Sequence, residues 1–420
     1  RRGLLSHGAR VNGQEFYEVV PRERVASIVR DVGTPGYTYF PEIVERQLSA
    51  VRTATRNRFE VHYAVKANPN PDVLSVLAGL GCGADVASGR ELRLARAAGI
   101  AAEEIEFSGP GKRREEIDLA VAEAVGSINV ESVEELSAVA ERAREQGRRA
   151  RVGIRLNPGA LAGRAGMRMA GDTQFGVMQE QLPDALSAIA AQEDHLDFTG
   201  FHAHFASQEL GADALVANMR ILLDAVAGLG SEVARTVRKL NFGGGWGIPY
   251  FPGQQPLDVA ALGSGVEDLL SDRTYDEVLR DARLIVEPGR FLVGESGIFS
   301  TTVLYVKKAT TKWFAVVDGG LNANYVLAGG MGTVIRRNFE LDVLEGVRDD
   351  RPQGPYDIAG PLCTPQDVLA TGVWRERGIG PGDVVVFFNC GAYGPTASPL
   401  DFLSHPRPTE SVVAAVRQPA

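Results

Sequence analysis

Between residues 60 and 290, short apolar segments alternate with amphipathic ones, and this repeat constrains the fold more than any other feature. Eight apolar segments have the length and composition of buried β-strands; they span 61–66, 83–87, 104–108, 126–130, 151–157, 198–205, 238–243 and 283–287. Helical stretches separate them, and the stretch 132–147 begins at Ser132 with Glu135 following it, as in a capping box. Eight consecutive strand–helix units predict a (β/α)8 TIM barrel. A doubly wound open sheet is the alternative, but the chain has no early G-x-G-x-x-G turn to favour it.

The sequence pattern changes after residue 297. The segments STTVLYVKKA, KWFAVVDGG and VVVFFNCGAY alternate apolar and polar residues, which is typical of β-strands. The segment 26–40 also has the pattern of a strand and a turn, so we expect it to join the same β-domain. The predicted organisation is therefore an N-terminal segment over 1–40, a barrel over 41–296 and a mostly-β C-terminal domain over 297–420.

The charge balance and the cysteine count exclude several classes of protein. The chain has 44 Lys and Arg against 53 Asp and Glu, a formal net charge of −9, which argues against nucleic acid as a partner. No apolar run reaches the roughly 18 residues of a membrane-spanning helix. The basic residues 1–10 are not followed by the apolar stretch of a secretion signal. The cysteines Cys82, Cys363 and Cys390 are too few for a disulfide framework, so we expect a cytoplasmic protein.

The residues with the most distinctive chemistry fall at the carboxyl ends of the predicted barrel strands. TIM-barrel enzymes bind their substrates at that end of the barrel, on the loops that follow the strands. The residues found there are Lys66, Asp85, Ser88, Arg155, Asn157, His202, His204, Gly243 to Gly245, and Glu287 to Arg290. Their common placement predicts one active site at this end.

Lys66 is the first candidate for chemistry. It follows an apolar strand, so we expect its stem to be buried in the barrel mouth. A buried lysine has a lowered pKa and becomes a nucleophile that forms Schiff bases. A structural lysine held in an ion pair is the alternative.

Two other groups of residues help to decide whether Lys66 is a Schiff-base lysine or a structural one. Gly243 to Gly245 would offer backbone N–H groups to a phosphate, although three glycines can also form a simple turn. Glu287 and Arg290 could form a salt bridge with each other and have no further role. A phosphate-bearing cofactor that forms an imine with a lysine needs all three groups together, and pyridoxal 5′-phosphate (PLP) is that cofactor.

His202 and His204 lie two residues apart on a predicted strand, so we expect them to face the same way. A metal pair is one interpretation, but it needs further ligands. The remaining histidines (His7, His62, His195 and His405) are not at the ends of barrel strands. The better interpretation is that one imidazole stacks on the pyridine ring of the cofactor.

With these motifs in place, the chain resembles the fold-type III PLP-dependent decarboxylases, the group that contains diaminopimelate and ornithine decarboxylases and shares an alanine-racemase-like barrel. The likeness covers nearly the whole chain. HYAVKANPN at 62–70 matches the motif whose lysine, here Lys66, forms the imine with the cofactor. The resemblance implies further cofactor contacts by Asp85, Arg155, His204, Ser207, Gly244, Gly245, Glu287, Pro288, Gly289 and Arg290. In it, His204 of FHAHFASQ stacks on the ring, Gly245 of GGGWG and Arg290 of EPGR meet the phosphate, and Glu287 meets the pyridine nitrogen.

The resemblance extends to the C-terminal domain. GPLC at 360–363 is similar to the motif whose cysteine, here Cys363, protonates the decarboxylated carbanion. GAY at 391–393 supplies a tyrosine, Tyr393, that reaches the phosphate and the substrate. The family has its sites at a head-to-tail homodimer interface, which implies that Cys363 comes from the subunit opposite Lys66.

The chain differs from the diaminopimelate decarboxylases in the motifs that bind the substrate. They carry a glutamate directly after the cysteine, where this chain has Thr364, and an arginine–proline–tyrosine stretch where it has Leu321 to Tyr325. GPLCTPQDVL and GAYGPTASPLDFLSHP instead resemble a subgroup from natural-product and exosortase-linked pathways. A member from butirosin biosynthesis acts on a glutamyl group tethered to an acyl carrier protein. We therefore expect a modified or carrier-tethered amino acid, with free diaminopimelate, ornithine or lysine as the alternative.

Two acidic residues bear on the far end of the substrate. Asp318 and Asp367 are the acids nearest the substrate-side motifs and could hold a distal amine. Alternatively, Asp318 begins a turn and Asp367 caps a following helix. Arg336 and Arg337 are close in sequence, but neither stands where diaminopimelate enzymes hold a distal carboxylate.

Two other functional classes remain as alternatives. Amino-acid racemases on this barrel set an arginine against the pyridine nitrogen, whereas Glu287 favours a protonated ring and hence loss of CO₂. Non-catalytic homologues tend to lack the lysine, the cysteine or the β-domain, and this chain has Lys66, Cys363 and the β-domain.

Overall fold

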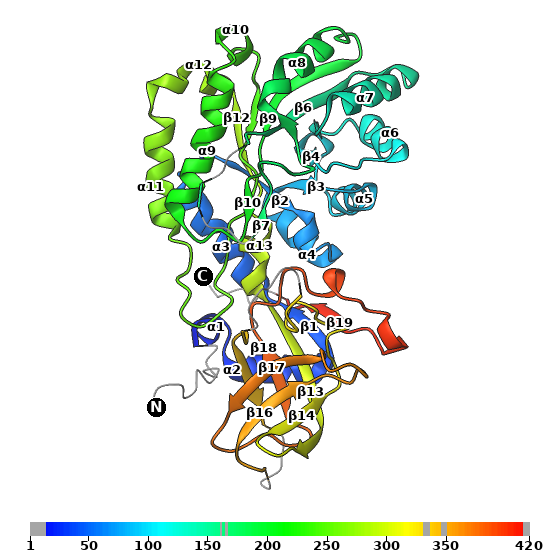
Figure 1. Cartoon of the computed structure of the whole chain (residues 1–420), viewed down its shortest axis with the longest axis vertical. Coiled ribbons are helices and arrows are strands. Elements are labelled where there is room, and N and C mark those ends of the chain that lie inside the picture. Colours follow the sequence, from blue (N-terminus) through cyan, green and yellow to red (C-terminus); the bar gives the residue numbers. More distant parts are fainter. Residues whose placement is uncertain (1–13, 160–161, 164–166, 331–336, 346–350, 415–420) are drawn as a thin grey trace. The chain divides into compact units, whose positions relative to one another are not determined.

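The computed structural model describes residues 14–159, 162–163, 167–330, 337–345 and 351–414, which form two compact units (Figure 1). The barrel unit comprises Glu45–Ile248 and Pro256–Leu292; the β unit comprises the described residues of Arg1–Val44, Pro249–Gln255 and Val293–Ala420. Pro249–Gln255 lies inside the range expected for the barrel. Its Tyr250 and Phe251 rings pack against Phe339 of the β unit, with centroids 4.8 and 5.6 Å apart.

Eight parallel strands close into a ring in the barrel unit, which confirms the predicted TIM barrel. They are β2 (Glu60–Ala64), β3 (Gly83–Val86), β4 (Ile105–Phe107), β5 (Ser127–Val130), β6 (Ala150–Asn157), β9 (Leu196–His202), β11 (Lys239–Asn241) and β12 (Arg283–Val286). Each strand pairs in parallel with the next in this order, and β12 pairs with β2 to close the ring. The strands are buried on both faces, as parallel strands covered by helices must be.

Helices alternate with the strands and surround the barrel (Figure 1). They are α4 (Pro71–Gly79), α5 (Gly89–Ala97), α6 (Arg114–Glu123), α7 (Val133–Glu145), α8 (Leu182–Ala190), α9 (Ala212–Ala227), α10 (Ser231–Ala234), α11 (Val259–Leu270), α12 (Asp276–Leu279) and α13 (Gly289–Val293), with α3 (Pro41–Ala54) leading into the barrel unit. Local sequence sets several starts: Ser88 Oγ accepts the Glu91 N–H at the start of α5, and Ser132 Oγ accepts the Glu135 N–H at the start of α7. The predicted helix at 132–147 is therefore α7.

The interior of the barrel is polar below the carboxyl ends of the strands. Glu106 and Lys239 form a buried ion pair, with Oε1 and Nζ 2.7 Å apart. Asn129 donates to Glu106 Oε2 and to Ser108 Oγ, both at 3.3 Å. Buried charges need such partners to offset lost hydration. This network fills the floor beneath the site.

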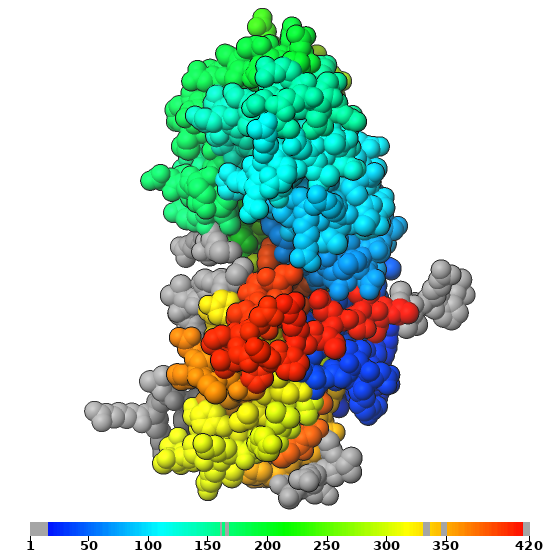
Figure 2. Space-filling view, turned by 90° about the vertical axis from the view of Figure 1, so that its right-hand side faces the viewer, coloured from blue at the N-terminus to red at the C-terminus, as the bar shows by residue number. Residues whose placement is uncertain are grey.

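The β unit is built on an eight-stranded sheet with the order β15-β18-β13-β14-β16-β17, to which β1 and β19 are added through β13. The strands are β1 (Gly36–Tyr39), β13 (Gly297–Lys308), β14 (Trp313–Val317), β15 (Leu341–Leu344), β16 (Pro355–Ala359), β17 (Val368–Trp374), β18 (Val384–Phe387) and β19 (Thr409–Val412). β1 pairs in parallel with β19, and Figure 2 shows the red C-terminal residues beside the blue N-terminal ones.

The N-terminal segment differs in part from its predicted form. Residues 26–32, the first part of the segment expected to form a strand and a turn, belong to helix α2 (Arg22–Val32), which is preceded by α1 (Gln14–Val19). The later part of that segment forms strand β1 as expected. Val25 and Val29, one helical turn apart, are buried in a core with Phe40 and Ile298. This spacing of apolar residues matches a helix face rather than a strand. Among the described residues, no helix is long and apolar enough to cross a membrane.

Candidate active site

Lys66 and Asp85 meet at the carboxyl ends of two neighbouring strands. β2 ends at Ala64, and Lys66 lies just beyond it in a 3-10 turn, Val65–Ala67. Its Nζ donates to Asp85 Oδ2 at 2.9 Å, from β3. The Lys66 side chain is 42% exposed, whereas that of Asp85 is 1% exposed. The expectation of a buried stem is therefore wrong, because the lysine stands on the turn past the strand.

Asp85 is held as a carboxylate by its neighbours. Burial opposes its ionisation, but the Lys66 ammonium, followed by His202, outweighs burial and lowers the pKa of Asp85. Its second oxygen, Oδ1, is buried with no hydrogen-bond partner among the described residues. Asp85 thus supplies a fixed negative charge that orients the Lys66 amine.

Glu287 lies directly after β12 and is 3% exposed. Its Oε1 accepts a hydrogen bond from Asn241 Nδ2 at 2.6 Å, and its Oε2 lies 3.3 Å from His202 Nε2. Its backbone N–H donates to Gly243 O at 2.8 Å. These three contacts fix both the backbone and the carboxylate of Glu287.

His204 lies two residues past the end of β9 and is half-buried. Its Nδ1 accepts the Gly244 N–H at 3.1 Å. Loss of hydration, and then the positive charges of Lys66 and Arg155 and the neighbouring His202, lower the pKa of His204 well below its usual value. His204 is therefore neutral near pH 7, with its proton on Nε2. His202 and His204 turn toward different partners, so they do not form the metal pair considered from the sequence.

The loop after β11, Gly243 to Gly245 (the glycine loop), is packed too closely for larger residues. Gly243 and Gly245 have φ of +66° and +91°, which favour glycine. A Cβ on Gly244 would lie 2.2 Å from Glu287 O, and one on Gly245 would lie 2.2 Å from Ala206 O. The Gly244 N–H is already bonded to His204 and is not the bare donor that the sequence suggested. The loop thus draws the segments that carry Glu287 and His204 together.

The remaining predicted barrel residues surround this centre. Arg155 forms a buried ion pair with Glu131 (Nη1 to Oε1, 2.7 Å), and its guanidinium lies 4.8 Å from the Phe175 ring centroid. Ser207 lies on β10 (Ala206–Ser207), which pairs with β7 (Met167–Arg168). The last three residues of EPGR are Pro288, which is buried, Gly289, where a Cβ would lie 2.9 Å from the Cβ of Ala64, and half-buried Arg290 on α13.

The cysteines differ in what they can do. All three are free. Burial raises the pKa of the Cys82 thiol to about 11 and that of Cys390 to about 12. Cys363 is exposed on a loop of the β unit, followed by half-buried Thr364. Of the three, only Cys363 has a solvent-exposed thiol-bearing side chain.

Tyr393 also lies on a loop of the β unit, with φ of +55°. A non-glycine residue in this region is uncommon and marks a backbone held by its surroundings. Its role, like those of Cys363 and Thr364, stays a prediction.

The two aspartates proposed for the substrate are engaged with the fold. Asp318 Oδ1 accepts from Thr301 Oγ1 (2.7 Å) and the Thr302 N–H (2.9 Å), and its Oδ2 accepts from Thr34 Oγ1 (2.6 Å).

Asp367 is 3% exposed, and its oxygens accept the N–H groups of Leu321 (2.6 Å) and Leu362 (2.7 Å). It precedes strand β17, so the helix that it was expected to cap is absent. These contacts favour a structural role for both aspartates over contact with a distal amine. Arg337 is exposed, with its guanidinium 5.9 Å from the Phe251 centroid, and Arg336 lies outside the described residues.

The sequence did not single out two residues that orient the site, Asn241 and Glu131. Asn241 is the last residue of β11, and Glu131 directly follows β5, so both stand at carboxyl ends, which was the available signal. Glu131 accepts from Arg155 and from the Gly109 and Gly176 N–H groups. Nothing in their local sequence showed which partner each would meet.

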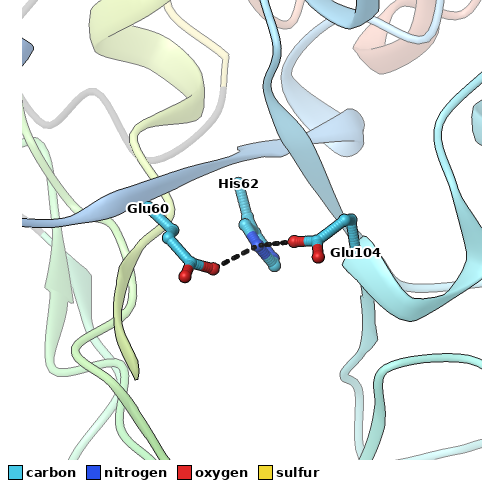
Figure 3. Close-up of side chains that lie close together, drawn as sticks. All are labelled: Glu60, His62 and Glu104. Atoms are coloured by element: carbon cyan, nitrogen blue, oxygen red, sulfur yellow. Dashed lines mark ion pairs between the residues drawn. The ribbon is translucent and has the colours of Figure 1, made fainter. Parts of the chain in front are cut away.

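A second cluster lies at the opposite, amino-terminal ends of the strands. His62 Nε2 is 3.5 Å from Glu104 Oε2 and 4.0 Å from Glu60 Oε2 (Figure 3). Among the described residues, these three are the one group of His, Cys, Asp and Glu compact enough to hold a metal ion. Arg283 pairs with both glutamates, with 2.7 Å from Nε to Glu60 Oε1 and from Nη2 to Glu104 Oε2. The guanidinium thus supplies the countercharge that a metal would otherwise provide.

The donors of the barrel site fit PLP. Lys66 offers an accessible amine for the aldehyde, and Glu287 offers an oriented carboxylate for the ring nitrogen. Neutral His204 offers a ring face, and Arg290 with Ser207 offers a cation and a hydroxyl for the phosphate. The buried, unbonded Oδ1 of Asp85 adds an acceptor beside the amine.

Comparisons with known proteins agree with this donor set. A family model described as "Pyridoxal-dependent decarboxylase, pyridoxal binding domain" matches residues 42–294. The chain is 34% identical over 390 residues to the L-glutamyl-[BtrI acyl-carrier protein] decarboxylase of Niallia circulans, covering 92% of this chain and 90% of that protein. It is 33% identical over 376 residues to the diaminopimelate decarboxylase of Bacteroides thetaiotaomicron, covering 87% and 92%. The solved structure of diaminopimelate decarboxylase from M. jannaschii in co-complex with L-lysine matches with a TM-score of 0.81 at 27% identity, covering 93% and 89%.

Proposed function

Because this chain belongs to the pyridoxal-dependent decarboxylases, we propose that it removes the α-carboxylate of an amino acid whose distal carboxyl is amidated, esterified or thioester-linked to an acyl carrier protein. Family membership confirms the predicted cofactor, PLP, and the predicted reaction class. It also favours decarboxylation over the racemase alternative. The substrate is the new element of the proposal.

The engagement of Asp318 and Asp367 is the observation that carries this choice. A substrate such as ornithine, lysine or diaminopimelate has a distal ammonium, which needs an acceptor with free lone pairs. Asp318 accepts from two hydroxyls and a backbone N–H, and Asp367 clamps two backbone N–H groups. A glutamyl thioester has no distal ammonium, and the 34%-identical relative is named for such a substrate.

The geometry of the barrel residues supports the following proposed roles. Bound PLP supplies an electron sink for the bond to the departing carboxylate. Lys66 provides the amine that holds the cofactor, and Asp85 keeps that amine oriented. Glu287 would accept a hydrogen bond from the ring nitrogen, while Arg290, Ser207 and Gly245 of the glycine loop would bind the phosphate.

The proposal also covers the protonation of the α-carbon and the assembly of a homodimer. Cys363, exposed on its loop, delivers the proton that replaces CO₂ at the α-carbon. We place Cys363 in the site of the partner subunit of a homodimer, with Thr364 and Tyr393 beside the substrate. The free state of all three cysteines agrees with a cytoplasmic enzyme.

Decarboxylation of free meso-diaminopimelate is the second candidate. The similarity to the B. thetaiotaomicron enzyme, 33% over 87% of this chain, favours it. CO₂ release from free diaminopimelate, lysine, ornithine and glutamate, measured beside glutamyl- and aspartyl-carrier thioesters, separates the two. We expect turnover of a tethered substrate. Efficient turnover of free meso-diaminopimelate, with none of the tethered forms, would overturn the proposal.

A further inference from the structure

We infer that His202 is a positioning residue which, with Asn241, holds the Glu287 carboxylate in the orientation that meets the ring nitrogen of PLP. The role of Glu287 at that nitrogen belongs to the proposed function, on which His202 therefore depends. Neither His202 nor Asn241 needs to touch the cofactor to act in this way.

The geometry shows one donor on each oxygen of the carboxylate. Asn241 Nδ2 lies 2.6 Å from Oε1, and His202 Nε2 lies 3.3 Å from Oε2. All three side chains are at least 97% buried, so water does not compete for these contacts. A carboxylate has about four lone-pair directions, so two donors fix its plane and leave directions for a further donor.

Each donor is itself oriented. Asn241 Oδ1 accepts the Gly243 N–H at 2.9 Å, which turns Nδ2 toward Glu287. His202 Nδ1 is buried with no hydrogen-bond partner among the described residues. A proton on Nδ1 would be a buried donor without an acceptor, whereas a proton on Nε2 has Glu287 Oε2 as its acceptor. That proton points to Glu287.

His202 and His204 lie two residues apart in the sequence but have different partners. The two histidines of FHAHFASQ thus have separate tasks: His204 bonds the glycine loop, and His202 supports Glu287.

A cofactor analogue without a ring nitrogen isolates this role. The test compares the dissociation constants of PLP and 1-deazapyridoxal 5′-phosphate for enzyme that has been freed of cofactor and reconstituted. A charge-assisted hydrogen bond to the ring nitrogen makes the native enzyme prefer PLP by at least about tenfold. In His202→Leu we expect this preference to fall to about threefold or less, with kcat lowered and KM nearly unchanged. His202→Gln, which keeps an N–H near the Nε2 position, should restore most of the preference.

His62→Leu is the matched control, because His62 is also 1% exposed in the barrel wall but lies at the opposite end. This variant should keep the native preference for PLP over the deaza analogue. The control therefore separates the general effect of a buried leucine from the loss of the contact between His202 and Glu287. Glu287→Gln tests the premise. If it keeps the native preference, the role of Glu287 at the ring nitrogen fails. If Glu287→Gln loses the preference while His202→Leu keeps it, the positioning role of His202 alone is refuted.

Discussion

Replacement of Asp367 by asparagine distinguishes a structural role from a substrate-binding role. The carboxylate accepts the N–H groups of Leu321 and Leu362 at 2.6 and 2.7 Å. Cβ atoms on Gly320 and Gly360 would lie 2.3 and 2.2 Å from its oxygens, so both loops close tightly on it. Asparagine keeps one acceptor and turns an NH₂ group toward the other N–H.

The magnitude follows from these contacts. Loss of one buried hydrogen bond to a charged group costs about 1.5–3 kcal/mol. For a unit of this size, about 2 kcal/mol lowers Tm by roughly 4–8 °C. We therefore expect Asp367→Asn to lower the Tm of the holoenzyme by that amount, while KM changes to a similar degree for every substrate that the enzyme accepts.

Thermal unfolding and steady-state kinetics on the same preparations check this expectation. Asp401→Asn is the control, because its side chain is 78% exposed and pairs with Arg407 at the surface. That variant should change stability by less than about 0.5 kcal/mol. The reasoning is refuted if Asp367→Asn matches the control in Tm but selectively raises KM for substrates with a distal amine.

Three further predictions concern the site and the barrel. Glu287→Gln should lower turnover at least about tenfold, roughly 1.4 kcal/mol; unchanged turnover at normal cofactor content would remove Glu287 from the mechanism. Mixed Lys66→Ala and Cys363→Ala subunits should recover up to about a quarter of native activity if the site spans a dimer, since random pairing restores about that share of sites; no recovery after verified subunit exchange would place the site within one chain. The close approach of His62 Nε2, and then Arg283 against the opposing effect of burial, lowers the pKa of Glu104 to about 2. Its stabilising contribution is therefore present above its unfolded pKa of about 4.3 and lost as pH falls toward 2. Glu104→Gln should flatten the loss of stability between about pH 5 and pH 2 in denaturant titrations, and an unchanged acid limb would contradict this.

The barrel could be predicted from the sequence because each of its strands is a buried apolar run followed by a helix-forming segment. Residues 26–32 were misassigned, since a short apolar segment fits both the strand period and the helix period until its packing partners, such as Phe40 and Ile298, are known. The position of Lys66 shows that the exact end of a strand could not be predicted from the sequence. The strand ends at Ala64, and this two-residue offset decides whether the side chain is buried or exposed.

The contacts that orient the site could not be predicted in the same way. Asn241 and Glu287 are in contact although they lie 46 residues apart in the sequence, and His202 and Glu287 lie 85 residues apart. Such pairs are set by which strands the closed barrel places side by side. For Asp367 both interpretations from the sequence were incomplete, because the N–H groups that it binds belong to loops that only the folded β unit brings together.

Identification of the lysine that holds PLP tests the central claim most directly. The barrel unit has three lysines, and only Lys66 has an exposed side chain, at 42%: the side chains of Lys112 and Lys239 are 1% and 11% exposed and paired with Glu135 and Glu106. After borohydride reduction of the holoenzyme and trypsin digestion, we expect the pyridoxyl group on Lys66, in a peptide spanning 59–90 that is not cleaved after that residue. The same label on Lys112, Lys239 or a lysine of the β unit would contradict this account of the site.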